Sequence, residues 1–227
     1  MTDLAPRLTA FLEREIGTPV HVDGLKRLPG GASREIWLFT LTRAGHAPEQ
    51  LVLRRDPAGH VIESSREGEF RLLRAAAAAG VPVPAVRWCG NPAAELGSFF
   101  VMDFVEGETI ARKLFREDAY AGARRQLPGQ LADALARIHA MDPAVLDFLA
   151  HPAADVTPAA AELKRYEDIF RAIAPDPHPA FELALRWLAQ RLPSPRRRTL
   201  VHGDYRVGNV IVGPEGLRAV IDWELSH

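Results

Sequence analysis

Apolar residues recur at helical spacing at the start of the chain. Leu4, Leu8 and Leu12 lie four residues apart, and Gly17 ends the pattern. Intervals of three and four residues place side chains on one face of a helix, and glycine is common just after a helix ends. The sequence therefore predicts an amphipathic helix over residues 4–16.

From residue 25 to about residue 56 the apolar pattern has a period of two, which is typical of strands. Within residues 33–42 both alternating sets are largely apolar, so we expect this strand to be covered on both faces of its sheet. A turn at residues 29–31 precedes it, and a helix over residues 64–79 interrupts the series. The strands predicted in this half are residues 25–28, 33–42, 50–55, 86–89 and 99–104.

The second half of the chain has the spacing of helices, with a small hairpin near its end. Leu131, Leu135 and Ile138 share one face of a helix that ends near Met141. The fold class is therefore α+β with two lobes, the first over residues 1–105 and the second over residues 106–227. The other elements predicted in the second lobe are helices over residues 158–173 and 179–191, a short strand over 199–202, and a hairpin of 210–212 with 218–221.

The composition narrows the class of protein. Of the 227 residues, 47% are hydrophobic and 25% are charged, which is typical of globular chains, and the net charge of −1 gives no electrostatic reason to expect a nucleic-acid partner. Cys89 is the single cysteine, which excludes an internal disulfide and a cysteine-only metal cluster. Without an apolar run of membrane-spanning length or a secretory signal, we expect a cytoplasmic protein that does not bind membranes.

The segment HGDYRVGN, followed after the hairpin by IDWE, carries the strongest chemical signal. Phosphoryl transfer needs a carboxylate that orients the acceptor hydroxyl and takes its proton, and oxygen ligands for the Mg²⁺ that bridges the phosphates. Asp204 and Asn209 lie on one loop, and the hairpin returns Asp222 beside them. Each residue alone could cap a turn or end a strand, but the three in this order favour catalysis, with Asp204 as the base and Asn209 and Asp222 as metal ligands.

These motifs resemble those of the aminoglycoside phosphotransferase and choline kinase superfamily, which has a protein-kinase-like fold. Together with LPGGASREIWLF and LVLRRDP, they are most similar to the kinase-like domain also found fused to acyl-CoA dehydrogenases. The resemblance runs from about Leu25 to the end of the chain. It implies a nucleotide-binding lobe with a five-stranded antiparallel sheet and one helix, a mainly helical second lobe, and transfer of the γ-phosphoryl of Mg·ATP to a hydroxyl. The acceptor would be an aminoglycoside-like sugar, another alcohol or a hydroxyacyl thioester.

The resemblance also implies how the phosphates are held. Gly30, Gly31 and Ser33 would form the loop that covers them, although a plain hairpin turn would use the same glycines. The family's lysine on the third strand is replaced by Arg54, which is paired with a carboxylate of the following helix. The family's spacing favours Glu69 over Glu67 for that carboxylate, and Arg55 is expected on the opposite, surface face.

Further roles follow from the resemblance for the hinge and the catalytic loop. Val52 and Met102 would enclose the adenine ring, while backbone groups from Asp103 to Val105 would bind its edge. Arg206 is placed like a lysine that some protein kinases use on the transferred phosphate. We expect a structural role for His202, whereas Glu224 is equally consistent with a carboxylate near the metal and with a surface residue.

One departure from the family concerns the end of the sequence. Five residues follow Asp222, whereas the family continues with helices that complete the second lobe. We therefore expect an incomplete second lobe, whose uncovered apolar surface could allow self-association. The alternative function is a kinase-like module that binds nucleotide without turnover.

Overall fold

The computed structural model describes residues 4–28, 35–56, 66–90, 96–149, 151–153, 155–174, 176, 178–195 and 197–227. The chain forms two compact units. The first contains Met1–Met141 and Val201–Ser226, and the second contains Asp142–Leu200 and His227. The predicted site residues all belong to the first unit, so its architecture positions the site. Gly30, Gly31 and Ser33 lie outside the described residues.

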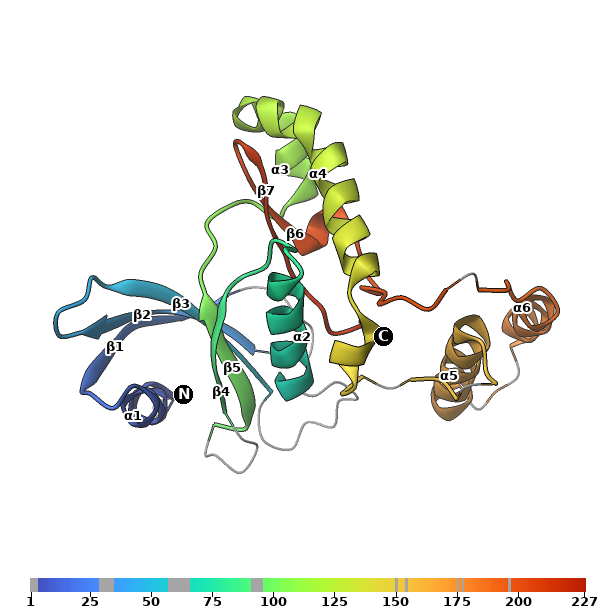
Figure 1. The fold of residues 1–227 in the computed structure, drawn as a ribbon, viewed down its shortest axis with the longest axis horizontal. Coiled ribbons are helices and arrows are strands. Elements are labelled where there is room, and N and C mark those ends of the chain that lie inside the picture. Colours follow the sequence, from blue (N-terminus) through green and yellow to red (C-terminus); the bar gives the residue numbers. More distant parts are fainter. Residues whose placement is uncertain are drawn as a thin grey trace. The chain divides into compact units, whose positions relative to one another are not determined.

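An antiparallel sheet of five strands in the order β1-β2-β3-β5-β4 forms the first half of this unit (Figure 1). The α+β class and the five-stranded sheet are confirmed. The first strand begins at Val20, earlier than predicted, because residues 20–23 pair with residues 40–43 of the neighbouring strand. The strands are β1 (Val20–Arg27), β2 (Glu35–Arg43), β3 (Glu49–Asp56), β4 (Val86–Gly90) and β5 (Ser98–Asp103).

Helix α1 (Leu4–Ile16) covers one face of the sheet, and the main apolar core lies between them. Its residues Leu8, Phe11 and Leu12 are buried against odd-numbered residues of β2, β3 and β5. Phe11 and Phe99 meet edge to face with ring centroids 4.8 Å apart. Alternate residues of a strand point to opposite faces, so the even-numbered residues of β3 and β5 point away from this core.

Helix α2 (Arg66–Ala78) lies on the opposite face, beside β4 and β5 (Figure 1). Leu72, Leu73 and Ala76 are its buried apolar residues. Because α2 packs over β4 and β5, the even-numbered face of β2 is only partly covered, and Leu38 is half-buried. The expectation that this strand is covered on both faces was therefore only partly right. The half-covered face is the one that bears Arg54.

The rest of the first unit carries the HGDYRVGN segment, residues 202–209, which is the predicted catalytic loop. Its elements are α3 (Ala111–Arg116), the short 3₁₀ helices η1 (Asp118–Tyr120) and η3 (Val207–Asn209), α4 (Ala121–Ala140), and a hairpin of β6 (Val210–Gly213) and β7 (Gly216–Val220). The hairpin lies along α4, where the Gln130 side chain accepts a hydrogen bond from the Leu217 N–H at 2.8 Å. The predicted helix end near Met141 and the predicted hairpin are confirmed. The strand predicted over residues 199–202 is wrong, because these residues pair with no strand among those that the structure describes.

The second unit contains the 3₁₀ helix η2 (Pro143–Leu146) and the helices α5 (Pro158–Ile173) and α6 (Pro179–Ala189). The two α-helices pack against each other through stacked rings of Phe170 and Phe181, whose centroids are 5.0 Å apart. Neither helix has a buried residue among those described, and Leu183 and Trp187 are more than half exposed. Across the described part of the chain, every helix is too short or too polar to span a membrane.

Candidate active site

Arg54 joins the sheet to the hairpin that follows the catalytic loop. It lies on the α2 side of β3 with only 7% of its surface exposed. Its Nη1 is 2.8 Å from Oε1 of Glu69 on α2, and its Nη2 donates a hydrogen bond to Oδ1 of Asp222 at 3.2 Å. Glu224 Oε2 lies 3.9 Å from the same Nη2. Glu69 is thus the helix carboxylate at Arg54, whereas Glu67 is exposed.

The electrostatics of Arg54 follow from these neighbours. Burial by itself would lower the pKa of Arg54, but the carboxylates of Glu69 and Asp222, with Glu224 further away, outweigh burial and raise it. Arg55 points to the other face of β3, where its Nε lies 3.1 Å from Oε2 of Glu35. A buried guanidinium between carboxylates from two segments can organise a phosphate site, since its flat fork presents several N–H groups at once.

The hinge residues lie in register on the same face of the sheet. Val52 of β3 pairs directly with Met102 of β5, and both are buried. The N–H of Asp103 donates to the carbonyl of Ala85 at 2.8 Å, and the Asp103 carboxylate accepts from Arg87 Nε at 2.6 Å. Of the groups predicted to bind the adenine edge, the Asp103 N–H is therefore already used. Val105 forms no hydrogen bond among the described residues.

The catalytic loop holds Asp204 between two donors. Asn209 Nδ2 donates to the backbone oxygen of Asp204 at 2.9 Å and to its Oδ2 at 2.7 Å. Arg206 Nε donates to both carboxylate oxygens at 3.0 and 3.1 Å. Arg206 is the main cause of a lowered pKa of Asp204, with a further contribution from Asn209. Asp204 is thus ionised at neutral pH, and in the structure Arg206 is engaged with this carboxylate.

His202 contacts the backbone on both sides of the site, which agrees with the structural role expected for it. Its Nε2 lies 3.1 Å from the backbone oxygen of Ile221, and its Nδ1 accepts a hydrogen bond from the N–H of Asp204 at 3.3 Å. A carbonyl oxygen can only accept, so this arrangement requires the neutral ring with the proton on Nε2. Burial lowers the pKa of His202 and favours the same neutral form. The imidazole therefore links the loop to Ile221, the residue between β7 and Asp222.

The backbone around the site adopts two conformations that few residue types tolerate. Gly203 has a φ of 84°, and a side chain there would collide with the backbone oxygen of Leu225. Asp222 has a φ of 67° and is the one non-glycine residue with positive φ in the described ranges. Aspartate tolerates this region better than most residues, and such strain is often found at functional positions.

The hairpin brings the two predicted metal ligands close together in the fold. Val210 pairs with Val220, and the N–H of Ile221 donates to the backbone oxygen of Asn209 at 3.0 Å. The Asn209 amide nitrogen is used on Asp204, so its amide oxygen is the atom that can bind a cation. A carboxylate and an amide oxygen are hard ligands that suit Mg²⁺, which usually takes one or two protein ligands together with phosphates and water. The donor set fits that metal.

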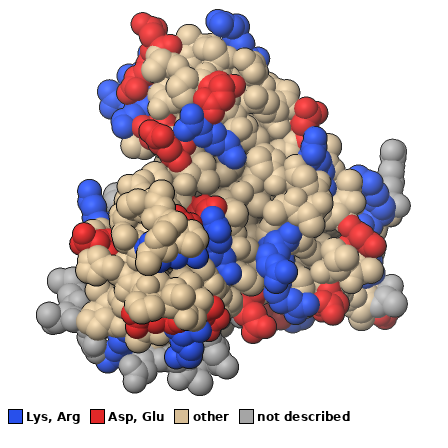
Figure 2. All heavy atoms as spheres, turned by 60° about the vertical axis from the view of Figure 1, so that its left-hand side comes forward, with Lys and Arg blue, Asp and Glu red and all other residues tan. Residues whose placement is uncertain are grey.

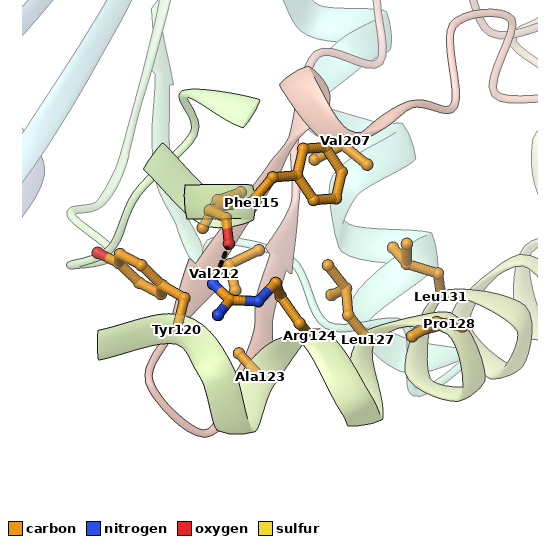
Figure 3. Close-up of a pocket in the computed structure, with 10 residues that line it drawn as sticks. Phe115, Tyr120, Ala123, Arg124, Leu127, Pro128, Leu131, Val207 and Val212 are labelled. Carbon is orange, nitrogen blue, oxygen red and sulfur yellow. Dashed lines mark hydrogen bonds between the residues drawn. The ribbon is translucent and has the colours of Figure 1, made fainter. Parts of the chain in front are cut away.

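A pocket of about 490 Å³ lies between α3, α4 and the start of the hairpin (Figure 3). Arg124 is the single charged residue among its described lining residues, and its Nη1 donates to the backbone oxygens of Leu114 and Glu117 at 2.9 and 2.7 Å. Val207 of η3 connects the pocket to the catalytic loop. The remaining walls are apolar or aromatic and come mainly from Phe115, Tyr120, Leu127, Pro128, Leu131 and Val212.

The comparison with protein families agrees with this geometry. The sequence model described as "Phosphotransferase enzyme family" matches residues 24–227, which include the strand bearing Arg54, the catalytic loop and the hairpin. The chain belongs to this phosphotransferase family. Membership supports kinase-like phosphoryl transfer as its activity, and the family predicted from the motifs is confirmed.

Relatives of this chain include a much longer curated protein. Acyl-CoA dehydrogenase family member 10 of Mus musculus is 34% identical over 191 residues, which cover 79% of this chain but 17% of the mouse protein. The chain thus spans about a sixth of that relative. A crystal structure from Ralstonia eutropha, described as a candidate aminoglycoside phosphotransferase, aligns with a TM-score of 0.72 and 22% identity over 97% of this chain and 64% of its own.

A second solved structure is a streptomycin–ATP ternary complex of an aminoglycoside phosphotransferase. It aligns with a TM-score of 0.56 and 17% identity over 100% of this chain and 74% of its own. At these identities the two structures establish the kinase-like fold.

Two residues beside the candidate site were missed by sequence reasoning. Arg66 is 1% exposed and contacts Glu69. Many arginines of this chain have a glutamate three or four residues away, so the spacing of Arg66 from Glu69 did not distinguish it. Ile211, between the buried Val210 and Val212, is half-buried and lies against Gly107, two residues after the hinge residue Val105. Strand alternation predicts that Ile211 points away from its two neighbours, but the sequence alone does not show that the hinge lies there.

Proposed function

We propose that this chain binds Mg·ATP between the α2 side of the sheet and the catalytic loop, and transfers the γ-phosphoryl group to a hydroxyl of a small molecule. One observation carries the proposal. Arg54, a buried cation on β3, contacts both Glu69 of α2 and Asp222 of the hairpin end. Parts of the chain 168 residues apart thereby converge on one place where phosphates and their cation can be held. A family relative in complex with ATP and streptomycin supports the nucleotide and a small-molecule acceptor.

The chemical step is a displacement at phosphorus. The acceptor oxygen forms a bond to the γ-phosphorus while the bond to the β–γ bridging oxygen breaks, giving a phosphate ester and ADP. Asp204 accepts a hydrogen bond from the acceptor hydroxyl and receives its proton as the new bond forms. Its lowered pKa makes it a weak base before attack, which suits a loose transition state in which positioning matters more than early deprotonation.

The remaining residues bind and orient the nucleotide. Arg54, fixed by Glu69, donates to phosphate oxygens, and residues 30–33 cover the phosphates. Val52 and Met102 enclose the adenine, whose edge meets backbone groups from Asp103 to Val105 other than the Asp103 N–H, which is bound to Ala85. Asn209 and Asp222 would hold Mg²⁺, which would supply positive charge against the phosphates. Arg206 keeps Asp204 oriented in the resting chain and turns to the transferred phosphate in the complex.

The acceptor is proposed only as a small-molecule alcohol. A polycationic aminoglycoside needs carboxylates around it, whereas the pocket beside Val207 has no acidic residue in the described lining. On the face in Figure 2, Lys and Arg are interspersed with Asp and Glu among the described residues, which gives no support to a nucleic-acid partner. Cytoplasmic localisation and self-association through uncovered apolar surface of the second lobe stay predictions from the sequence.

The test compares two conservative variants in an assay of ATP consumption against a panel of hydroxylated small molecules. Asp204→Asn removes a group that acts in the transition state, so kcat should fall about 10²–10⁴-fold while ATP affinity is retained. Asp222→Asn removes a metal ligand, so ATP affinity and kcat should fall together. Unchanged kcat in Asp204→Asn on a verified acceptor would refute the catalytic assignment. Tight ATP binding with no turnover on any acceptor would favour the alternative, a nucleotide-binding module without activity.

A further inference from the structure

Arg66 is a buried charged residue for which the proposed reaction has so far given no role. It is the first residue of α2, its exposure is 1%, and it is among the largest fully buried side chains of the described residues. A guanidinium is seldom buried this completely unless carboxylates compensate the loss of water. Two carboxylates do so here. Arg66 Nε donates to Oδ2 of Asp56 at 3.0 Å, and Arg66 Nη1 donates to Oε2 of Glu69.

These two partners belong to different elements of the phosphate site. Asp56 is the last residue of β3, two residues after Arg54, and Glu69 lies one helical turn beyond Arg66 on α2. Arg66 therefore connects the end of the strand that carries the cation with the helix that carries its carboxylate. The contacts form a continuous series from Asp56 through Arg66, Glu69 and Arg54 to Asp222.

The two arginines contact different oxygens of the Glu69 carboxylate, and the contact with Arg66 is the one aligned as a hydrogen bond. Oε1 of Glu69 lies 2.8 Å from Arg54 Nη1 but has no aligned hydrogen-bond partner among the described residues, so that contact is an attraction between charges with little directional restraint. Oε2 is hydrogen-bonded to Arg66. The orientation of Glu69, and through it the position of the Arg54 guanidinium, is thus set from the Arg66 side.

We propose that Arg66, anchored on Asp56, is a positioning residue that aims Glu69 at Arg54 and so presents Arg54 to the phosphates of the nucleotide. This role rests on the proposed function of Arg54. It implies that Arg66 affects binding of the phosphates and leaves binding of the adenosine part unchanged. It also implies that the effect of Arg66 disappears when Arg54 is absent.

The experiment measures the dissociation constants of Mg·ATP and of adenosine by calorimetry for the whole chain and its variants. Arg66→Met keeps most of the side-chain volume and removes the charge; we expect Mg·ATP affinity to fall about 10-fold, the size typical of coupled charged neighbours, with adenosine affinity unchanged. In an Arg54→Met background, Arg66→Met should cause no further loss. Arg66→Lys should recover part of the affinity, because an ammonium can reach one of the two carboxylates. The matched control is Arg74→Met on the exposed side of α2, where Arg74 lies over the Phe70 ring; it should leave both constants unchanged.

The outcomes separate this proposal from the proposed function. If the unaltered chain does not bind Mg·ATP, the proposed function fails and the role of Arg66 fails with it. If the chain binds Mg·ATP but Arg66→Met weakens ATP and adenosine equally, or its effect adds fully to that of Arg54→Met, Arg66 merely supports the fold and the present proposal alone is overturned. Should Arg66→Met not fold, Arg66→Lys decides by the same comparison of ATP with adenosine and the same Arg54→Met background.

Discussion

Replacing Arg54 by lysine keeps the charge and changes its shape, and we predict that this chain will not tolerate the change. The guanidinium uses two nitrogens for two carboxylates, Nη1 at 2.8 Å from Glu69 and Nη2 at 3.2 Å from Asp222. A lysine ammonium is a single point at the end of a flexible stem. It can stay at Glu69 only by giving up the hydrogen bond to Asp222, and it also loses the flat fork that meets phosphate.

The magnitude follows from the lost interaction. A hydrogen bond to a charged group contributes about 1.5–3 kcal/mol when its partners are shielded from water. The Arg54 side chain is 8% exposed and that of Asp222 is 36% exposed, so the lower half of this range is appropriate. The hydrogen bond that the Arg54 fork would donate to a phosphate oxygen lies in the same half-shielded site, so its loss, at about 1.5–2 kcal/mol, corresponds to roughly a 10- to 30-fold loss of Mg·ATP affinity.

The adjacent residue provides a matched control. Arg55→Lys is the same substitution one position further along β3, on the other face of the strand, where the partner is Glu35 and the side chain is 19% exposed. A partly exposed pair contributes little, about 0–1 kcal/mol, so ATP affinity should be unchanged. Calorimetric titration of both variants with Mg·ATP is the assay. Equal losses at the two positions, or a loss of less than twofold in Arg54→Lys, would refute the assignment of Arg54 to the phosphates.

Three further predictions concern the metal, the loop and its support. Removal of Mg²⁺ with EDTA should weaken ATP binding; equal affinity with and without the metal would contradict ligation by Asn209 and Asp222. Burial lowers the pKa of His202 in the folded chain, so the unfolded chain binds more protons, and the free energy of unfolding should fall as the pH drops below the unfolded pKa of about 6.5. The slope of the unfolding free energy against pH should be smaller in His202→Gln, and equal slopes would count against a neutral His202. Tyr205→Phe removes a hydrogen bond of 2.8 Å to the backbone oxygen of Leu131 and should cost about 1 kcal/mol in urea unfolding, with no loss meaning that the bond contributes nothing.

Much of the fold could be predicted because the signals that specify it are local. Periods of 3.6 and 2, with glycine and proline at the ends, predict the helix over residues 4–16, the strands of the sheet and the last hairpin. The structure places most of them within a few residues, whereas the first strand begins five residues earlier than expected. The strand expected at 199–202 failed because a strand needs a partner, and the two apolar residues of this segment, Leu200 and Val201, do not supply one.

The candidate site likewise has a part that the sequence determines and a part that depends on the tertiary structure. The sequence by itself determined that Asp204 and Asn209 share a loop and that a hairpin returns Asp222, since these residues are neighbours along the chain. Only the tertiary structure decided that Glu69 and not Glu67 faces Arg54, and that a buried Arg66 is hydrogen-bonded to Glu69. It also decided that Arg206 is hydrogen-bonded to Asp204 and that the Asp103 N–H already has an acceptor. Those contacts depend on which helix face meets the sheet and on segments far apart in sequence coming together. A pattern of residue types contains the spacing within each element, whereas the charges that meet across elements are fixed by how the elements pack.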